Sequence, residues 1–180
     1  DDNEERIGGS NPADPSDPPV SRALEFGGTS ADYMEIPISA RQRVTDWTLE
    51  AWVYPPSVTG GVGTVARRVV QNLGGPTNAL NYVLGIETNG SGELQAYGGY
   101  VLTDGREFLV RGGTVPTGLW SYVAVSYDSL TSELLLYTNG FIAVSSNAQF
   151  STPPFNGKGG AAFVRVGEDF QGRIDEVRLW

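Results

Sequence analysis

Residues 121–147 read SYVAVSYDSLTSELLLYTNGFIAVSSN, and this stretch decides the fold class. It contains three short runs of β-branched and aromatic residues, at 121–127, 133–137 and 141–145, separated by polar turns. Asn139 and Gly140 join the second run to the third, and Asn-Gly is a strong hairpin signal because both residues tolerate positive φ. The stretch therefore predicts consecutive antiparallel strands.

The same pattern extends in both directions along the chain. Tyr82, Leu84 and Ile86 share one face of a run, as do Phe108 and Val110 in another. The chain has 24 glycines, and no stretch shows a sustained helical period. We expect about twelve strands, at 23–26, 33–38, 48–54, 64–70, 82–87, 93–97, 107–110, 121–127, 133–137, 141–145, 163–166 and 173–179.

Strands at this spacing predict an all-β fold, a two-sheet antiparallel β-sandwich or jelly roll. A closed up-and-down barrel is the structural alternative. In the sandwich, segments 23–26 and 173–179 should lie close together. The side chains of Trp52, Trp120, Leu136 and Val177 should be buried.

The chain divides into a short leading segment and one domain. Residues 1–19 read DDNEERIGGSNPADPSDPP, which is acidic, Pro-rich and almost free of apolar side chains. Such a segment cannot offset its ordering entropy by burial, so it is expected to be a linker or tail. Residues 20–180 form the domain, which is large enough to fold without disulfides. The start at Asp1 suggests a module with neighbouring domains in a larger chain.

Composition limits the chemistry. There is no His and no Cys, so the commonest general base and the usual transition-metal ligands are missing, and a bound metal should be an oxygen-liganded ion such as calcium. The net charge of −9 argues against nucleic-acid binding, which needs basic patches. No apolar run approaches the ~18 residues of a membrane span.

Carboxylates are the remaining candidates for catalysis. Glycosidases use two carboxylates on one strand face, and alternate residues are needed to share a face. Glu168 and Asp169 are adjacent, as are Asp175 and Glu176, so each pair is expected to diverge on a strand. We therefore expect no enzyme. Arg67 and Arg68 should point to opposite faces, with a salt bridge favoured over a ligand site.

Four segments, in order, resemble the LamG-like jelly rolls of the concanavalin A-like lectin/glucanase superfamily. They are ALEFGG (23–28) with DYMEIP (32–37), WTLEAWVYP (47–55), GLWSYVAVSYD (118–128) leading into LYTNG (136–140), and FQGRIDEVRLW (170–180). The chain departs from the family pattern at Gly27, where Asp is common, and at Ser121 and Tyr122, where a His pair is common. Members of this fold have diverse functions.

The resemblance implies a structural calcium ion. Asp175 matches a calcium ligand of concanavalin-like folds, and carbonyls around Gly27 and Gly28 would complete the shell with mixed oxygen ligands. The alternative is that Asp175 pairs with an arginine such as Arg22 or Arg173, or accepts backbone N–H bonds.

The aromatic residues divide into core and ligand candidates. Trp47, Trp52 and Trp120 lie in the strand motifs and are expected in the core. Tyr97, Tyr100, Tyr54 and Phe155 lie in or beside Gly-rich turns, where a ring could stack on a sugar, although an exposed Tyr is ordinary in a β-protein.

The leading interpretation is a non-catalytic extracellular module that binds a glycan or a protein partner. Binding would use rim loops at 60–63, 73–78, 103–105 and 151–160, because binding residues often lie on loops of a rigid sandwich. A structural module that packs with its neighbours in a filament or sheath is the second interpretation. A glycan-degrading enzyme is the third.

Overall fold

The computed structural model describes residues 23–37, 39–58, 62–70, 78–147, 153–155 and 162–180. The expected tail at 1–19 lies outside these residues, as do most residues of the expected rim loops at 60–63, 73–78 and 151–160.

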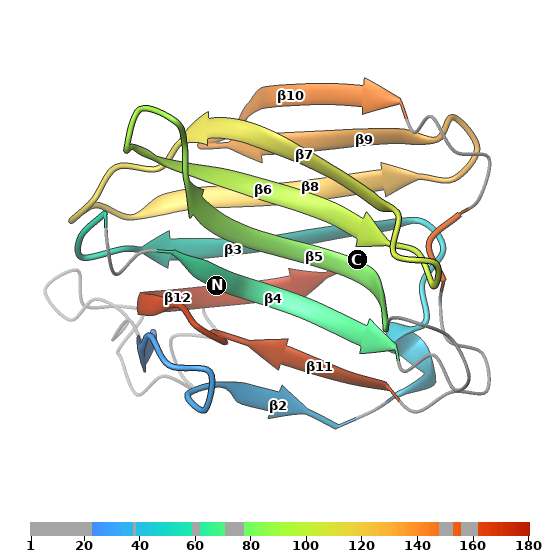
Figure 1. The fold of residues 1–180 in the computed structure, drawn as a ribbon, viewed down its shortest axis with the longest axis horizontal. Coiled ribbons are helices and arrows are strands. Elements are labelled where there is room, and N and C mark those ends of the chain that lie inside the picture. Colours follow the sequence, from blue (N-terminus) through green and yellow to red (C-terminus); the bar gives the residue numbers. More distant parts are fainter. Residues whose placement is uncertain (1–22, 38, 59–61, 71–77, 148–152, 156–161) are drawn as a thin grey trace, which may run out of the picture.

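Twelve strands of the described residues form two antiparallel sheets that pack face to face (Figure 1). One sheet, here the terminal sheet, has the order β1 (Leu24–Gly27), β12 (Gln171–Leu179), β3 (Trp47–Tyr54), β8 (Ser121–Asp128), β9 (Glu133–Thr138) and β10 (Phe141–Asn147). The other, the front sheet, has the order β2 (Met34–Ile36), β11 (Ala162–Val166), β4 (Gly63–Val70), β5 (Ala79–Thr88), β6 (Leu94–Val101) and β7 (Glu107–Thr114).

The predicted fold class is confirmed: the structure is a β-sandwich, not a closed barrel, and every predicted run overlaps a strand. The first and last strands are neighbours, with Leu24 opposite Ile174 and Gly27 opposite Gln171. The described residues contain a single turn of 3-10 helix at Ala40–Gln42. They include no helix long and apolar enough to span a membrane.

The core lies between the sheets and follows the period-two alternation of the strands. Trp47 and Leu49 of β3 point inward, and Tyr82 and Leu84 of β5 meet them from the front sheet. Leu136 of β9 is fully buried, as predicted, whereas Val177 is only partly buried against the core. Burying an aliphatic side chain of this kind stabilises the fold by about 1.5–3 kcal/mol.

Two tryptophans contradict the predicted core. The side chains of Trp52 and Trp120 are 39% and 38% exposed. Ala51 and Val53 point inward, so Trp52 between them must point outward, because successive strand residues face opposite sides. Ser121 is buried at the start of β8, and Trp120 before it is turned to the outer face in the same way.

The inward position of Leu136 gives a test of this packing. Leu136→Ala should lower the free energy of unfolding by about 2–5 kcal/mol, because it removes buried methyl groups and leaves a cavity. The neighbouring Leu135 faces outward and is the matched control: Leu135→Ala should cost clearly less. Urea denaturation of both variants measures the difference, and equal losses would contradict the assigned register.

Candidate functional site

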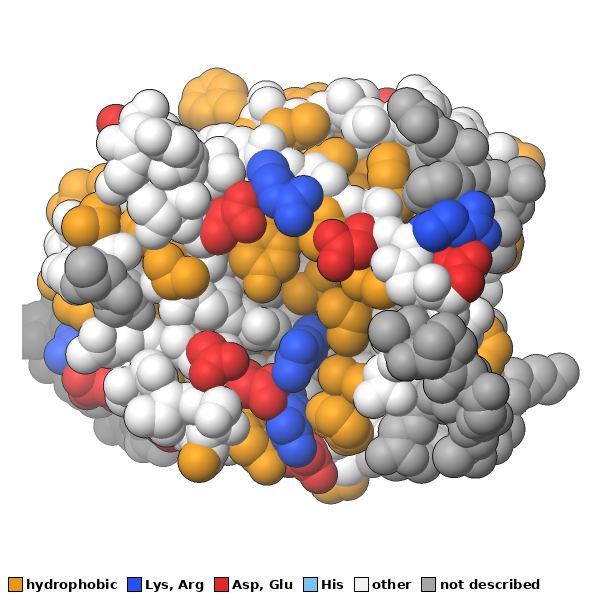
Figure 2. Space-filling model, viewed as in Figure 1, with side chains coloured by type: hydrophobic (Ala, Val, Ile, Leu, Met, Phe, Trp, Pro, Cys, Tyr) orange, Lys and Arg blue, Asp and Glu red, His pale blue; other side chains and the backbone are white. Residues whose placement is uncertain are grey.

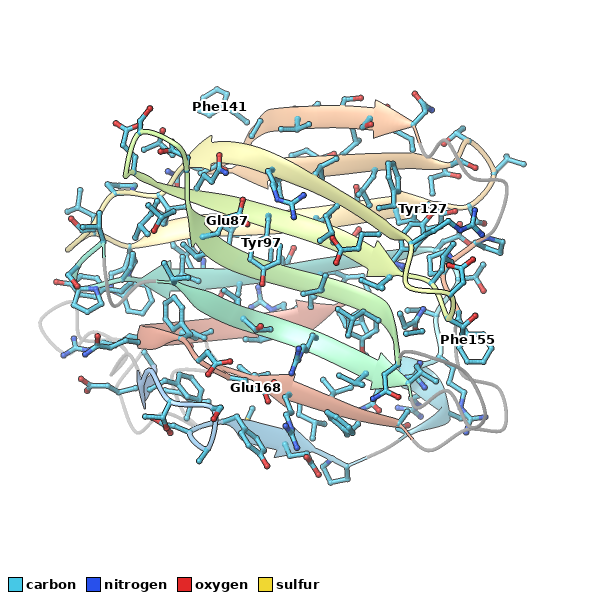
Figure 3. The ribbon with its side chains drawn as sticks, viewed as in Figure 1. Glu87, Tyr97, Tyr127, Phe141, Phe155 and Glu168 are labelled. Carbon is cyan, nitrogen blue, oxygen red and sulfur yellow. The ribbon has the colours of Figure 1, made fainter. Side chains whose placement is uncertain are left out.

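The outer face of the front sheet, which faces the viewer in Figures 2 and 3, carries Tyr97 near its centre. Thr64, Gly85, Tyr97 and Arg111 are successive partners across β4, β5, β6 and β7. The ring of Tyr97 lies over Gly85, where any side chain would overlap it. The Thr64 side chain hydrogen-bonds the phenol, and burial raises the pKa of Tyr97. The ring is therefore fixed, half-buried and neutral.

A first polar cluster lies beside this ring. Glu87 of β5 accepts a hydrogen bond from Gln95 Nε2 at 2.9 Å through Oε1. The same oxygen lies 3.2 Å from Arg111 Nε. Figure 3 shows Glu87 and Tyr97 next to each other in the middle of the sheet. The three polar side chains hold one another in place at the edge of the ring.

A second polar cluster is built around Glu168, which lies in the turn after β11. The Glu168 side chain is only 7% exposed. Its carboxylate pairs with Arg67 of β4 and, at 2.7 Å, with Nη1 of Arg165 of β11. Arg165 also donates through Nε to Glu35 at 3.1 Å and lies 3.9 Å from the ring centre of Tyr33. Both guanidinium groups are therefore held by a nearly buried carboxylate.

An uncharged row continues from the second cluster across the sheet. Val83, Gly99 and Leu109 are successive partners across β5, β6 and β7, and Arg67 pairs with Val83 at the end of this row. Figure 2 shows the resulting pattern, in which basic and acidic side chains adjoin each other with hydrophobic ones between them. A flat ring, an apolar strip and fixed hydrogen-bonding groups suit a ligand that combines apolar faces with hydroxyl groups.

Of the four predicted stacking residues, only Tyr97 lies on this face. Tyr100 is fully buried, which contradicts its assignment as an exposed ring: it is three residues from Tyr97 and so points to the opposite side of β6. Tyr54 lies on the outer face of the terminal sheet, 5.6 Å from Trp120. Phe155 lines a hollow of about 340 Å³ beside Pro154 at one end of the sandwich. The four residues do not form one site.

Gly27 and Asp175, which the resemblance implies as calcium ligands, do not lie together. Gly27 pairs with Gln171, so Asp175 lies four residues further along β12, or about 13 Å away, whereas two oxygens bound to one calcium ion are at most ~5 Å apart. The carboxylate next to Gly27 belongs instead to Asp32, which accepts its N–H. Asp175 accepts the N–H of Glu176 at 2.8 Å, as the alternative interpretation expected. Among the described residues, no three acidic side chains gather to hold a metal ion.

A β-bulge overturns the prediction that Asp175 and Glu176 diverge. Asp175 pairs with Trp52 and Arg178 with Glu50, which leaves one extra residue on β12. Glu176 takes up the irregularity with a φ of +51°. Asp175 and Glu176 consequently both line a hollow of about 350 Å³ on the outer face of the terminal sheet, together with Trp52 and Trp120.

The arginine doublet behaves as predicted. Arg68 points inward, is fully buried and donates to Asn81 Oδ1 at 3.1 Å, whereas Arg67 points outward to Glu168. The partner itself was not identified from sequence, because Arg67 and Glu168 are 101 residues apart. Glu87 and Arg111 were missed as well, although the outward alternation of Glu87 beside Ile86 was a usable signal.

Neutralising Glu168 tests the second cluster. Glu168→Gln should lower the free energy of unfolding by about 1–3 kcal/mol, because Arg67 and Arg165 lose a nearly buried partner while remaining partly solvated. Glu107→Gln, an exposed position on the same sheet, is the control and should change stability by less than ~0.5 kcal/mol. Urea denaturation at neutral pH makes the comparison, and equal effects would show that Glu168 is an ordinary surface charge.

Solved structures with a similar fold include glycan-binding domains. The CBM40 of the Ruminococcus gnavus IT-sialidase, bound to α2,3 sialyllactose, has a TM-score of 0.60 at 14% identity, over 88% of this chain and 89% of that one. Domain 4 of AbnA, a GH43 extracellular arabinanase from Geobacillus stearothermophilus, in complex with arabinotriose, has a TM-score of 0.54 at 20% identity. The match covers 87% of this chain and 69% of that one.

A further similar structure comes from mouse laminin. Domains LG4-5 of the mouse laminin α1 chain have a TM-score of 0.59 at 11% identity, and the match covers 89% of this chain and 42% of that one. At these identities the likeness concerns the fold alone. No curated protein sequence gives a significant match to this chain.

The family model provides the assignment that the fold likeness cannot. The model described as the concanavalin A-like lectin/glucanases superfamily matches residues 27–180, which includes every described strand after β1 and the end of β1 itself. The chain therefore belongs to the concanavalin A-like lectin/glucanase superfamily.

Proposed function

We propose that this domain is a non-catalytic extracellular recognition module that binds a glycan on the outer face of its front sheet. The observation that carries the proposal is the ring of Tyr97, which lies across Gly85 between two clusters of fixed polar side chains. A sugar presents an apolar face to such a ring and hydroxyl groups to the carboxylate, amide and guanidinium groups beside it.

The similar structures support a glycan as the ligand. Two of them are recorded with an oligosaccharide, sialyllactose in one and arabinotriose in the other. Both are parts of carbohydrate-active proteins, and the arabinanase is described as extracellular. These are properties of those proteins, and they make a glycan and an extracellular setting the first hypotheses to test for this chain.

The state of the acidic groups on this face favours binding over hydrolysis. Glycoside hydrolysis needs one carboxyl group that can donate a proton and a second that acts as a base or nucleophile. Here the carboxylate of Glu168 is held by Arg67 and Arg165, and that of Glu87 by Gln95 and Arg111. Both carboxylates are already engaged by protein donors, which argues against their acting as a catalytic pair.

Removal of the ring tests the proposal. Tyr97→Ala should weaken binding to the best-bound oligosaccharide by about tenfold or more, since the stacking surface is lost. Tyr137→Ala removes a half-buried ring from the outer face of the other sheet and should leave binding unchanged. A glycan array identifies the oligosaccharide, and isothermal titration calorimetry compares the three proteins. Loss of binding in the Tyr137 variant alone would place the site on the terminal sheet.

A second candidate function has its own observation, the edge strand β10. Its seven residues, FIAVSSN, carry no charge, and among the described strands it pairs only with β9. Phe141 and Ile142 are 78% and 60% exposed, and Figure 3 shows Phe141 projecting from this edge. Edge strands are usually protected by charges, so an uncharged apolar edge suits pairing with a neighbouring copy in an assembly.

Self-association of the domain tests this second function. If β10 pairs with another copy, the sedimentation coefficient should rise with protein concentration, and Ile142→Lys should abolish the rise by placing a charge in the interface. Leu130→Lys adds the same charge at a position that is 93% exposed in a turn, and should leave association intact. A monomer at all concentrations would remove this candidate.

A further inference from the structure

We infer that the glycan recognised by the front-sheet face is uncharged, and that sialylated, uronic or sulfated sugars are disfavoured there. This inference rests on the proposed glycan-binding function and specifies its ligand class. It comes from the pairing of the charged side chains on the face.

The basic groups of this face are already occupied. Among the described residues, three arginines lie on it: Arg67, Arg111 and Arg165. Arg111 Nε lies 3.2 Å from Glu87, and Arg165 contacts Glu168 at 2.7 Å. Arg67 shares the same Glu168 carboxylate. An acidic sugar could reach Arg67 or Arg165 only by displacing Glu168, and at Arg111 it would have to share the guanidinium with Glu87.

Displacement is costly because of where the carboxylates lie. The Glu168 side chain is 7% exposed, so a ligand that took Arg67 or Arg165 from it would leave a nearly buried charge without its partner. Glu87 is more accessible, at 28%, which makes Arg111 the easiest guanidinium to reach. Even there, the incoming anion would approach the Glu87 carboxylate at close range.

The charge balance of the face adds to this cost. Four carboxylates, of Glu35, Glu87, Glu107 and Glu168, stand against the three arginines, which leaves an excess of one negative charge among these seven side chains. The whole chain has a net charge of −9. An anionic ligand is therefore repelled both locally and at a distance.

A neutral sugar meets no such penalty. Its hydroxyl groups can donate to the carboxylate oxygens of Glu87 without breaking the pair with Arg111, because a carboxylate has about four acceptor positions. The Gln95 amide and the Tyr97 phenol lie beside it as further polar groups. The fixed ion pairs thus act as hydrogen-bonding groups for hydroxyls, and the ring of Tyr97 provides the stacking surface.

The experiment compares matched neutral and acidic glycans on the intact chain. A glycan array should pair each neutral oligosaccharide with its sialylated, glucuronylated and sulfated forms, for example lactose with sialyllactose. For the wild type, each acidic form should bind at least tenfold more weakly than its neutral parent at physiological salt. Tyr97→Ala should weaken the neutral binding, which links the preference to this face.

Glu87→Gln provides a gain-of-function variant. It removes the partner of Arg111 and one negative charge. The ratio of the dissociation constant of each acidic glycan to that of its neutral parent should therefore fall by about tenfold. Glu133→Gln removes the same charge from the terminal sheet and should leave the preference unchanged, which separates local pairing from net charge. Circular dichroism and urea denaturation confirm that both variants are folded.

The possible failures are distinguishable. If the wild type prefers acidic glycans and Tyr97→Ala abolishes that binding, the face binds glycans but the inference of a neutral ligand is overturned. If the Glu87 and Glu133 variants change the preference equally, the pairing argument is overturned. If no glycan binds, or binding ignores Tyr97→Ala, the proposed function fails and this inference fails with it.

Discussion

The packing of two six-stranded sheets over one shared apolar layer is the constraint on which the rest of this structure depends. Every second residue of the central strands is committed to that layer, so only the alternate positions are free for recognition. On β6 the rule separates Tyr100, in the core, from Tyr97, on the surface. The outer faces of the two sheets are therefore the surfaces on which the alternate side chains of these strands can meet a partner.

The sequence was sufficient for the fold and for part of the site. Short runs with period-two alternation and the Asn139-Gly140 turn predict strands from local chemistry, and the strands appear where the runs are. The errors at Trp52 and Trp120 arose because large apolar residues in a family motif were assigned to the core, whereas strand parity places them outside. Parity alone would have given the correct side for both residues.

Other features depend on contacts that no local pattern encodes. The bulge at Glu176 is a property of the pairing between β12 and β3, and it reverses the expectation for two adjacent carboxylates. The pairing of Glu168 with Arg67 joins segments 101 residues apart. The register of β1 on β12, which places Gly27 opposite Gln171 and away from Asp175, is likewise invisible in the sequence. In each case the missing information was which strand residues face each other.

The adjacency of the first and last strands has a mechanical consequence. Leu24 begins β1 opposite Ile174, and β12 then runs on to Leu179, so the first residue of one strand and the last of the other lie at the same end of the pair. Antiparallel hydrogen bonds run perpendicular to the strands. A force that pulls these two ends apart therefore acts along the bonds and opens them one after another, as in a zipper, with only four residue pairs to resist it. Under tension β1 should peel away first, while the core between β3 and the front sheet stays closed.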